Sequence, residues 1–141
     1  MIYLDTSALI KRYIWESGSE YVLQIYKGNA TLVTSKIAYV EAYAAFTRRM
    51  REGHLPPIRY SRVCRLFERE WPAYLTVEVR DEVLRLSRDL IKKYPLRGFD
   101  ALHLASAKSL WLNLRTPITF ACADQRLLES AKAESFELLG V

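Results

Sequence analysis

The sequence predicts an α/β domain built around a mostly parallel sheet. Short apolar runs typical of buried strands alternate along the chain with longer segments of helical periodicity. Turn signals separate these segments, and no internal repeat, low-complexity stretch or flexible linker interrupts them. The 141 residues suit one domain, since domains cluster near ~100–150 residues. We therefore expect residues 1–141 to form a single domain whose sheet is covered by helices on both faces.

The first half of the chain begins with a strand that stops at a polar cluster. The opening run MIYL ends at DTS, a good helix cap, and the next helical segment starts behind SGS and ends at Gly28. Basic residues at the end of KIAYVEAYAAFTRRMR complement a helix dipole, and EGHLPP breaks the pattern. The expected elements are strands at 1–4 and 30–35 and helices at 7–14, 18–27, 36–51 and 58–70.

The second half repeats the alternation of strands and helices. AYLTVE predicts a short strand, YPLRG is a breaker, and the nearly all-apolar segment FDALHLASAKSLWLNL indicates a largely buried helix. PITFACAD predicts a strand that ends in a carboxylate. The expected elements are strands at 73–78, 117–124 and 135–141 and helices at 80–93, 99–114 and 125–133.

The composition excludes several classes of protein. Half of the residues are hydrophobic, yet no apolar run reaches the ~18–20 residues of a spanning helix, and the N-terminus lacks the pattern of a signal peptide. We therefore expect a cytoplasmic protein. Cys64 and Cys122 form no C-x-x-C pair with each other or with a histidine, which argues against a disulfide framework or structural zinc site. The net charge of +5 favours an anionic partner such as nucleic acid or an acidic protein.

Three aspartates stand at predicted junctions between strands and helices. Asp5 ends the first strand, Asp124 ends the ITFACA strand, and Asp100 opens the buried helix. Ligands of parallel sheets bind at the carboxyl edge, where Asp5 and Asp124 are both expected. Each aspartate taken singly is also explained as a helix cap, which stabilises by typically ~1 kcal/mol.

Glu41 does not fit the capping explanation. It lies within the apolar and small residues of IAYVEAYAAF, where burying an unpaired carboxylate costs several kcal/mol. Arg48 is two helical turns away and too far to neutralise it. An arginine from elsewhere in the fold, or a cation shared with the aspartates, would satisfy the carboxylate.

Four segments that carry these acids resemble motifs of the PIN-domain ribonucleases, and most closely those of the VapC toxins of VapBC toxin–antitoxin pairs. YLDTSALIKRY is similar to the opening strand with the first acid, Asp5, and SKIAYVEAYAAF to the segment with the second, Glu41. LRGFDALHLASA supplies Asp100, and FACADQRLLESA supplies Asp124. The resemblance covers the whole chain.

The resemblance implies a three-layer α/β/α sandwich and hydrolysis of RNA by an endoribonuclease that depends on Mg²⁺ or Mn²⁺. The catalytic and metal-binding residues would be Asp5, Glu41, Asp100 and Asp124. We expect Asp5 and Asp100 to contact a first ion directly, while Glu41 and Asp124 hold waters, a second ion or the attacking water. The resemblance also implies a homodimer and a VapB-like antitoxin whose tail inserts a basic side chain or blocks the acidic site.

One position departs from the family pattern. The family often has a hydroxyl residue two before the fourth acid, and this chain has Cys122 there. A thiol is a weaker hydrogen-bond donor than a hydroxyl, so the placement of Asp124 or of a nearby water is affected. Thr6 and Ser7 each have two interpretations, a local cap or a hydroxyl that holds a water near Asp5.

Other candidates for substrate contacts lie outside the acids. His103, three residues after Asp100, is expected as a hydrogen-bonded core histidine, with phosphate contact as the alternative. Arg97 is the best candidate for steering RNA into an acidic pocket. Two groups of arginines are expected to contact phosphates if they flank the acids, and to be solvated helix faces otherwise. Four aromatic residues are candidates for base stacking or for core and dimer contacts. These are Arg48, Arg49 and Arg51; Arg62, Arg65 and Arg69; and Tyr13, Trp15, Tyr39 and Tyr43.

Two other functions compete with that of a nuclease. A phosphoryl-transfer domain of the haloacid-dehalogenase type needs a second acid two residues after the first, where this chain has Ser7, and a receiver domain needs an acidic pair at the first strand end. The sequence also lacks the glycine-rich nucleotide-binding loops. A non-catalytic RNA- or protein-binding module, with its acids acting as caps and salt bridges, remains the alternative.

Overall fold

The sheet at the centre of the fold is entirely parallel. The computed structural model describes residues 1–141, and its strands lie in the order β3-β2-β1-β4-β5. Strand β1 pairs with β2 on one side and with β4 on the other. The strands are β1 (Ile2–Leu4), β2 (Leu32–Ser35), β3 (Leu75–Val77), β4 (Thr119–Cys122) and β5 (Glu137–Gly140).

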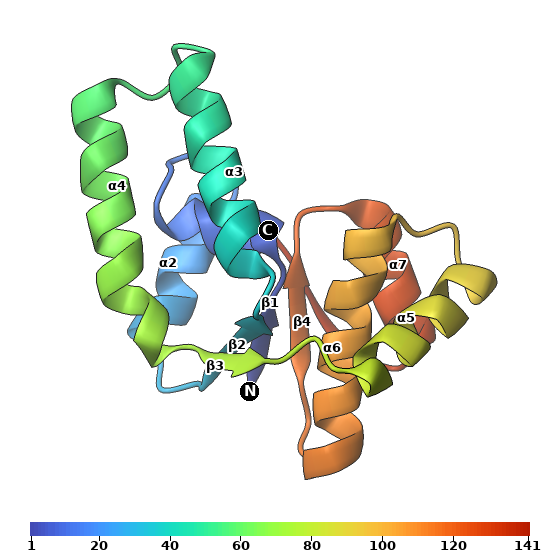
Figure 1. The fold of residues 1–141 in the computed structure, drawn as a ribbon. Helices are drawn as coiled ribbons and strands as arrows, with labels where there is room; N and C mark the ends of the chain where they lie inside the picture. The colour runs from blue at the N-terminus through green and yellow to red at the C-terminus, as the bar shows by residue number, and fades with distance from the viewer.

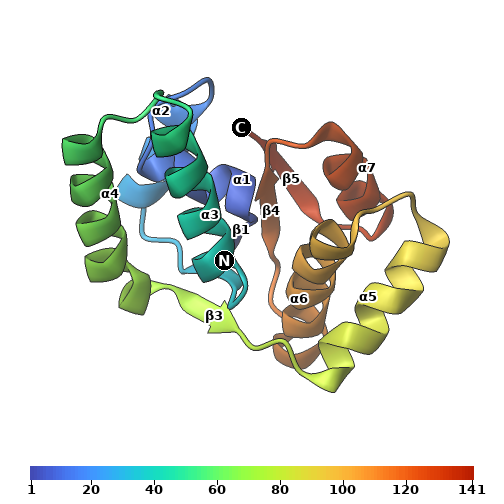
Figure 2. The same cartoon turned by 45° about the horizontal axis from the view of Figure 1, so that its top comes forward.

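Helices cover both faces of the sheet, which confirms the predicted three-layer α/β/α sandwich. Figures 1 and 2 show α1 to α4 on one side of the sheet and α5 to α7 on the other. None of the helices combines the length and apolar character needed to cross a bilayer. The helices are α1 (Thr6–Leu9), α2 (Ser19–Lys27), α3 (Ala38–Arg51), α4 (Pro57–Glu70), α5 (Asp81–Lys93), α6 (Gly98–Leu114) and α7 (Gln125–Ala133), with 3₁₀ turns η1 (Ile10–Arg12) and η2 (Trp71–Ala73).

Each face of the sheet has its own hydrophobic core. Successive strand residues point to opposite faces, so Leu4 packs with Phe46 and Phe67 under α1 to α4, whereas Tyr3 packs with Phe120 and Leu104 under α5 to α7. All six side chains are fully buried. Because both faces are covered, the central strands are apolar runs without the alternation of a half-exposed sheet.

One predicted helix was wrong in extent, and the other boundaries differ by one or two residues. The helix expected at 7–14 is α-helical only to Leu9 and then tightens into η1. Ile10 and Tyr13 are nevertheless buried in the core under α1 to α4. Cys64 and Cys122 are free thiols, which confirms the absence of a disulfide.

The order of the strands creates a crevice at the carboxyl edge between β1 and β4. The chain passes from β1 outward through β2 to β3, and then returns to the other side of β1 to form β4. Loops that follow β1 and β4 therefore diverge to opposite faces of the sheet. This reversal is the place where open parallel sheets bind their ligands.

Glu134 joins three helices on the face opposite α1 to α4. Its side chain is 6% exposed and pairs with Lys93 at 2.7 Å and with Lys108. The Tyr94 hydroxyl donates to the same carboxylate at 2.7 Å. Burial opposes ionisation, but the hydrogen bonds from Lys108, Lys93 and Tyr94 prevail and lower the pKa of Glu134 to about 2.

We expect the ionisation of Glu134 to make the free energy of unfolding depend on pH under acidic conditions. Its pKa is about 2 in the folded protein and ~4.3 when unfolded, so its contribution is complete above ~4.3 and lost as the pH falls toward 2. Glu134→Gln should flatten the fall of the urea midpoint across this window. The control is Glu129→Gln, which replaces an exposed carboxylate on α7. If the urea midpoints of wild type and Glu134→Gln depend equally on pH, the role of Glu134 is refuted.

Candidate functional site

Asp5 lies at the floor of the crevice, at the end of β1. It is the N-cap of α1, and its Oδ1 accepts a hydrogen bond from the amide of Ala8 at 2.8 Å. The Ser7 hydroxyl lies 2.8 and 2.9 Å from the two carboxylate oxygens. Burial raises the pKa of Asp5, although nearby His103, the Ala8 amide and Ser7 favour the carboxylate. Capping and ligand binding are thus compatible uses of this side chain, since a carboxylate has about four lone-pair sites.

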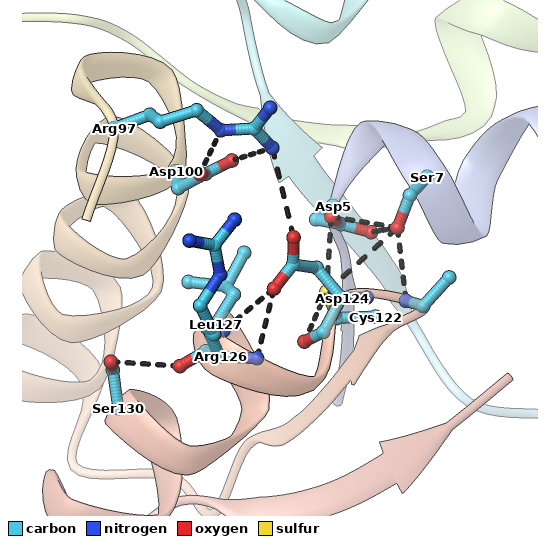
Figure 3. A network of polar contacts seen from close by, with 10 residues as sticks. Asp5, Ser7, Arg97, Asp100, Cys122, Asp124, Arg126, Leu127 and Ser130 are labelled. Atoms are coloured by element: carbon cyan, nitrogen blue, oxygen red, sulfur yellow. Dashed lines mark hydrogen bonds and ion pairs between the residues drawn. The ribbon is translucent and has the colours of Figure 1, made fainter. Parts of the chain in front are cut away.

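Asp124 lies beside β4, and its two carboxylate oxygens contact different partners. Its Oδ1 caps α7 by accepting from the amides of Arg126 at 2.9 Å and Leu127 at 3.1 Å. Its Oδ2 points away from the helix toward Arg97, whose Nη2 lies 3.7 Å away (Figure 3). One oxygen therefore remains available to a cation while the cap is kept.

Asp100 faces the crevice from the first turn of α6. The capping interpretation of Asp100 was wrong, because α6 begins at Gly98 and places Asp100 in the third helical position. The Arg97 Nε donates to Asp100 Oδ2 at 2.8 Å. Figure 3 shows this guanidinium between Asp100 and Asp124. Arg97, 72% exposed, therefore neutralises two of the acids and does not point freely into solvent.

Glu41 lies in the first turn of α3, and the sequence pattern did not indicate its hydrogen-bond partners. His103 Nε2 lies 2.7 Å from Glu41 Oε2, and the Thr6 hydroxyl donates to the same oxygen at 2.5 Å. Burial opposes ionisation of Glu41, but His103 and Thr6 prevail and lower its pKa. Of the two possibilities raised from the sequence, an arginine from elsewhere in the fold contributes, since the charge of Arg97 also lowers the pKa of Glu41, after His103 and Thr6.

His103 is a hydrogen-bonded core histidine, which confirms the structural interpretation. It is 3% exposed, and its Nδ1 lies 3.0 Å from the Tyr3 hydroxyl. The capping interpretation of Thr6 was wrong, since its hydroxyl lies 3.0 Å from His103 Nε2 and contacts Glu41. Three elements, β1, α1 and α6, thus fix the position of Glu41.

Cys122 takes the place of the hydroxyl expected near the fourth acid and still connects the two walls of the crevice. Its thiol donates to Asp5 Oδ2 at 3.2 Å, and its sulfur accepts from the Asp124 amide at 3.1 Å. Burial raises the pKa of the Cys122 thiol, which keeps it a neutral donor. The Ser7 hydroxyl also accepts from the Ala123 amide at 2.9 Å, so Ser7 ties α1 to the loop after β4.

The donor set of the crevice suits a hydrated hard cation better than a closed metal cage. Asp5, Glu41, Asp100 and Asp124 offer only carboxylate oxygens, the ligands that Mg²⁺ and Mn²⁺ prefer. No three side chains of Asp, Glu, His or Cys surround one point in this arrangement. Mg²⁺ is usually held by one or two carboxylates and several waters, so this spacing fits it once Arg97 is displaced.

A cavity of about 800 Å³ adjoins Glu41 and Asp100. Apolar side chains such as Phe99 form part of its wall, and Arg88 and Lys92 add positive charge beside Arg97. Sequence reasoning missed Arg88 and Lys92, whose only signal is their i, i+4 spacing on the predicted helix. The two arginine groups named from the sequence do not line this cavity.

The four aromatic candidates lie apart from the acids. Tyr13 is buried and its hydroxyl lies 2.7 Å from that of Tyr74, which makes it a core residue. Tyr39 and Tyr43 pack against Phe67 between α3 and α4. Trp15 is 67% exposed.

Comparison with known proteins identifies relatives along the whole chain. The family model described as PIN domain matches residues 2–120. Two ribonucleases of Mycobacterium tuberculosis, VapC45 and VapC49, are each 33% identical to this chain over 134 residues, which cover 94% of this chain and 90% of theirs.

Solved structures share the fold at low sequence identity. FitAcB from Neisseria gonorrhoeae superposes with a TM-score of 0.71 at 15% identity and covers 99% of this chain and 97% of its own. VapBC2 from Rickettsia felis, bound to a DNA fragment from its promoter, gives a TM-score of 0.65 at 13% identity over 100% of this chain and 99% of its own. The parallel sheet with acids at its switch point agrees with these matches. The chain therefore belongs to the PIN-domain family, and VapC ribonucleases are among its relatives.

Proposed function

We propose that this protein is a Mg²⁺- or Mn²⁺-dependent endoribonuclease and the toxin of a VapBC-type toxin–antitoxin pair. The observation that carries the proposal is the convergence of carboxylates from four separate elements on one edge of the sheet. Relatives named VapC ribonuclease match 94% of the chain, which supports RNA as the substrate. Asp5, Glu41, Asp100 and Asp124 are the proposed catalytic and metal-binding residues.

The proposed reaction is hydrolysis of an RNA phosphodiester. Water forms a new bond to phosphorus, the bond to the leaving ribose oxygen breaks, and that oxygen takes up a proton. A divalent cation, when bound, lowers the pKa of a coordinated water and stabilises charge on the phosphoryl oxygens. Asp124 Oδ2 and the carboxylate of Asp100 both pair with Arg97 and would hold such a cation in its place (Figure 3).

Neighbouring side chains position these carboxylates. Ser7 and Cys122 hold Asp5 through a hydroxyl and a thiol, and His103 with Thr6 holds Glu41. Partners of this kind fix the orientation of ligands, and their loss typically costs ~10–100-fold in metal affinity or activity. Arg97 sits where it can transfer from the acids to a substrate phosphate once a cation takes its place.

The proposal extends to partners and location. A VapB-like antitoxin is supported by relatives in the VapBC family and by the fold shared with solved toxin–antitoxin complexes. A homodimer is supported by the exposed apolar side chains Leu84, Ile91 and Phe99 on α5 and α6. We propose a cytoplasmic location, where cellular RNA is accessible.

A second candidate function is a PIN-fold binding module that does not cut RNA. It is favoured by the capping bonds of Asp5 and Asp124 and by the ion pair of Asp100, which satisfy these acids without a metal. Such a module would bind RNA in EDTA and leave it intact. Replacement of the acids separates the two functions.

Asp5→Asn and Asp100→Asn should each lower metal-dependent RNA cleavage by about 100-fold or more, because each removes negative charge that would hold the cation. Asn keeps the N-cap of α1, so Asp5→Asn should fold. The measurement is cleavage of RNA by purified protein with Mg²⁺, with Mn²⁺ and with EDTA. Glu129→Gln, an exposed carboxylate outside the crevice, is the control and should keep full activity. Undiminished cutting by both aspartate variants, or cutting in EDTA, would rule out the proposed site.

Arg97→Ala should tighten binding of Mn²⁺ to the protein about two- to fivefold, because an exposed ion pair that competes with the cation is removed. Isothermal titration calorimetry without RNA measures this directly. Arg126→Ala is the matched control, since Arg126 lies next to the site (Figure 3) but pairs with none of its acids. Equal affinities of Arg97→Ala and wild type would show that Arg97 does not occupy the cation position.

A further inference from the structure

The hairpin of α3 and α4, which lies apart from the helices that cover the opposite face (Figure 1), carries an excess of positive charge. Residues 38–70 contain seven arginines and four glutamates, an excess of three positive charges in a chain of net charge +5. Arg49 pairs with Glu16, but Arg62, Arg65 and Arg69 form no ion pair and are exposed. We call these three residues the α4 arginine row.

The acids of α4 contact other partners, and neither forms an ion pair with an arginine of the row. Glu68 accepts hydrogen bonds at 2.5 Å from the hydroxyls of both Tyr39 and Tyr43. Glu70 pairs with Arg12 of η1 at 2.7 Å. An ordinary solvated helix face pairs its arginines with neighbouring glutamates at i+3 or i+4, and this face does not.

The α4 arginine row presents a continuous binding surface. Its members are spaced i, i+3 and i+7, so they lie along one face of the helix over about 10 Å, the axial length of roughly three nucleotides of a duplex strand. All three line a surface groove of about 780 Å³ that also contains Tyr43 and one carboxylate, Glu68. Guanidinium groups suit the phosphates of RNA, and an aromatic ring beside them suits its bases.

The C-terminal end of the row lies level with the first turns of α3, because α3 and α4 run antiparallel (Figure 1). Glu68, adjacent to Arg69, contacts Tyr39, which precedes Glu41 by two residues on α3. Arg62 lies almost two helical turns further toward the tip of the hairpin. RNA bound along the row would therefore extend from the level of the acids outward along α4.

We propose that the α4 arginine row binds the phosphate backbone of RNA outside the catalytic crevice and so anchors substrates longer than a few nucleotides. The inference rests on the proposed ribonuclease function for its substrate. It favours RNA over an acidic protein segment, because a groove with a tyrosine and regularly spaced guanidinium groups matches phosphates and bases together. The contact is independent of sequence and of divalent metal.

The test is RNA binding in EDTA as a function of salt concentration. The variant Arg62→Gln/Arg65→Gln/Arg69→Gln is compared with Lys27→Gln/Arg85→Gln/Lys132→Gln, which removes the same charge from three exposed positions outside the hairpin. We expect the row variant to bind a 20-nucleotide RNA at least tenfold more weakly, with a slope of log affinity against log salt smaller by about 2, since each lost phosphate contact contributes ~0.7. Circular dichroism checks that both variants fold.

The outcomes separate this inference from the proposed function. Equal RNA affinity and salt slope of the two variants would overturn the inference and identify a solvated face. Loss of binding to polyglutamate with unchanged RNA binding would also overturn it and identify an acidic protein as the partner. Weakened RNA binding by the row variant supports the inference even if the wild type cuts no RNA, in which case only the proposed function fails.

Discussion

Four carboxylates at one edge of a sheet repel one another, and the rest of the site exists to hold them there. Asp5 and Asp124 accept hydrogen bonds from amides at the N-termini of helices. The Arg97 guanidinium pairs with Asp100 and Asp124, and the His103 imidazole contacts Glu41. Hydrogen bonding and nearby positive charge both favour the ionised form, whereas burial opposes it. The balance differs among the acids, since burial raises the pKa of Asp5 while His103 and Thr6 lower that of Glu41.

The parallel sheet makes this convergence possible. Because β1 lies between β2 and β4, the loops after β1 and β4 open a crevice at the switch point, and helices α3 and α6 reach it from opposite faces. Caps and candidate ligands coincide for the same reason: a strand that ends in Asp followed by a helix both starts the helix and aims a carboxylate at the edge. The capping and metal-binding interpretations of Asp5 and Asp124 are therefore two descriptions of one geometry.

Residue patterns predicted the architecture more completely than they predicted side-chain partners. The alternation of strands and helices gave both layers of helices, and α7 begins and ends where predicted. The predicted helix at 7–14 is α-helical only to Leu9, and no local pattern signals the 3₁₀ turn that follows. Arg97 was expected to face RNA, and it is paired with Asp100 because the two lie three residues apart at the start of α6.

The sequence by itself determined the fold class, because strand ends, caps and hydrophobic periodicity are local properties of the chain, and the family resemblance singled out the four acids. Only the tertiary structure decided how the acids are neutralised. His103 reaches Glu41 across 62 positions, and Cys122 reaches Asp5 across 117. Such pairs depend on which elements pack together, so no spacing along the chain encodes them. The unpaired state of the α4 arginine row is decided in the same way, by the distant partners that hold Glu68 and Glu70.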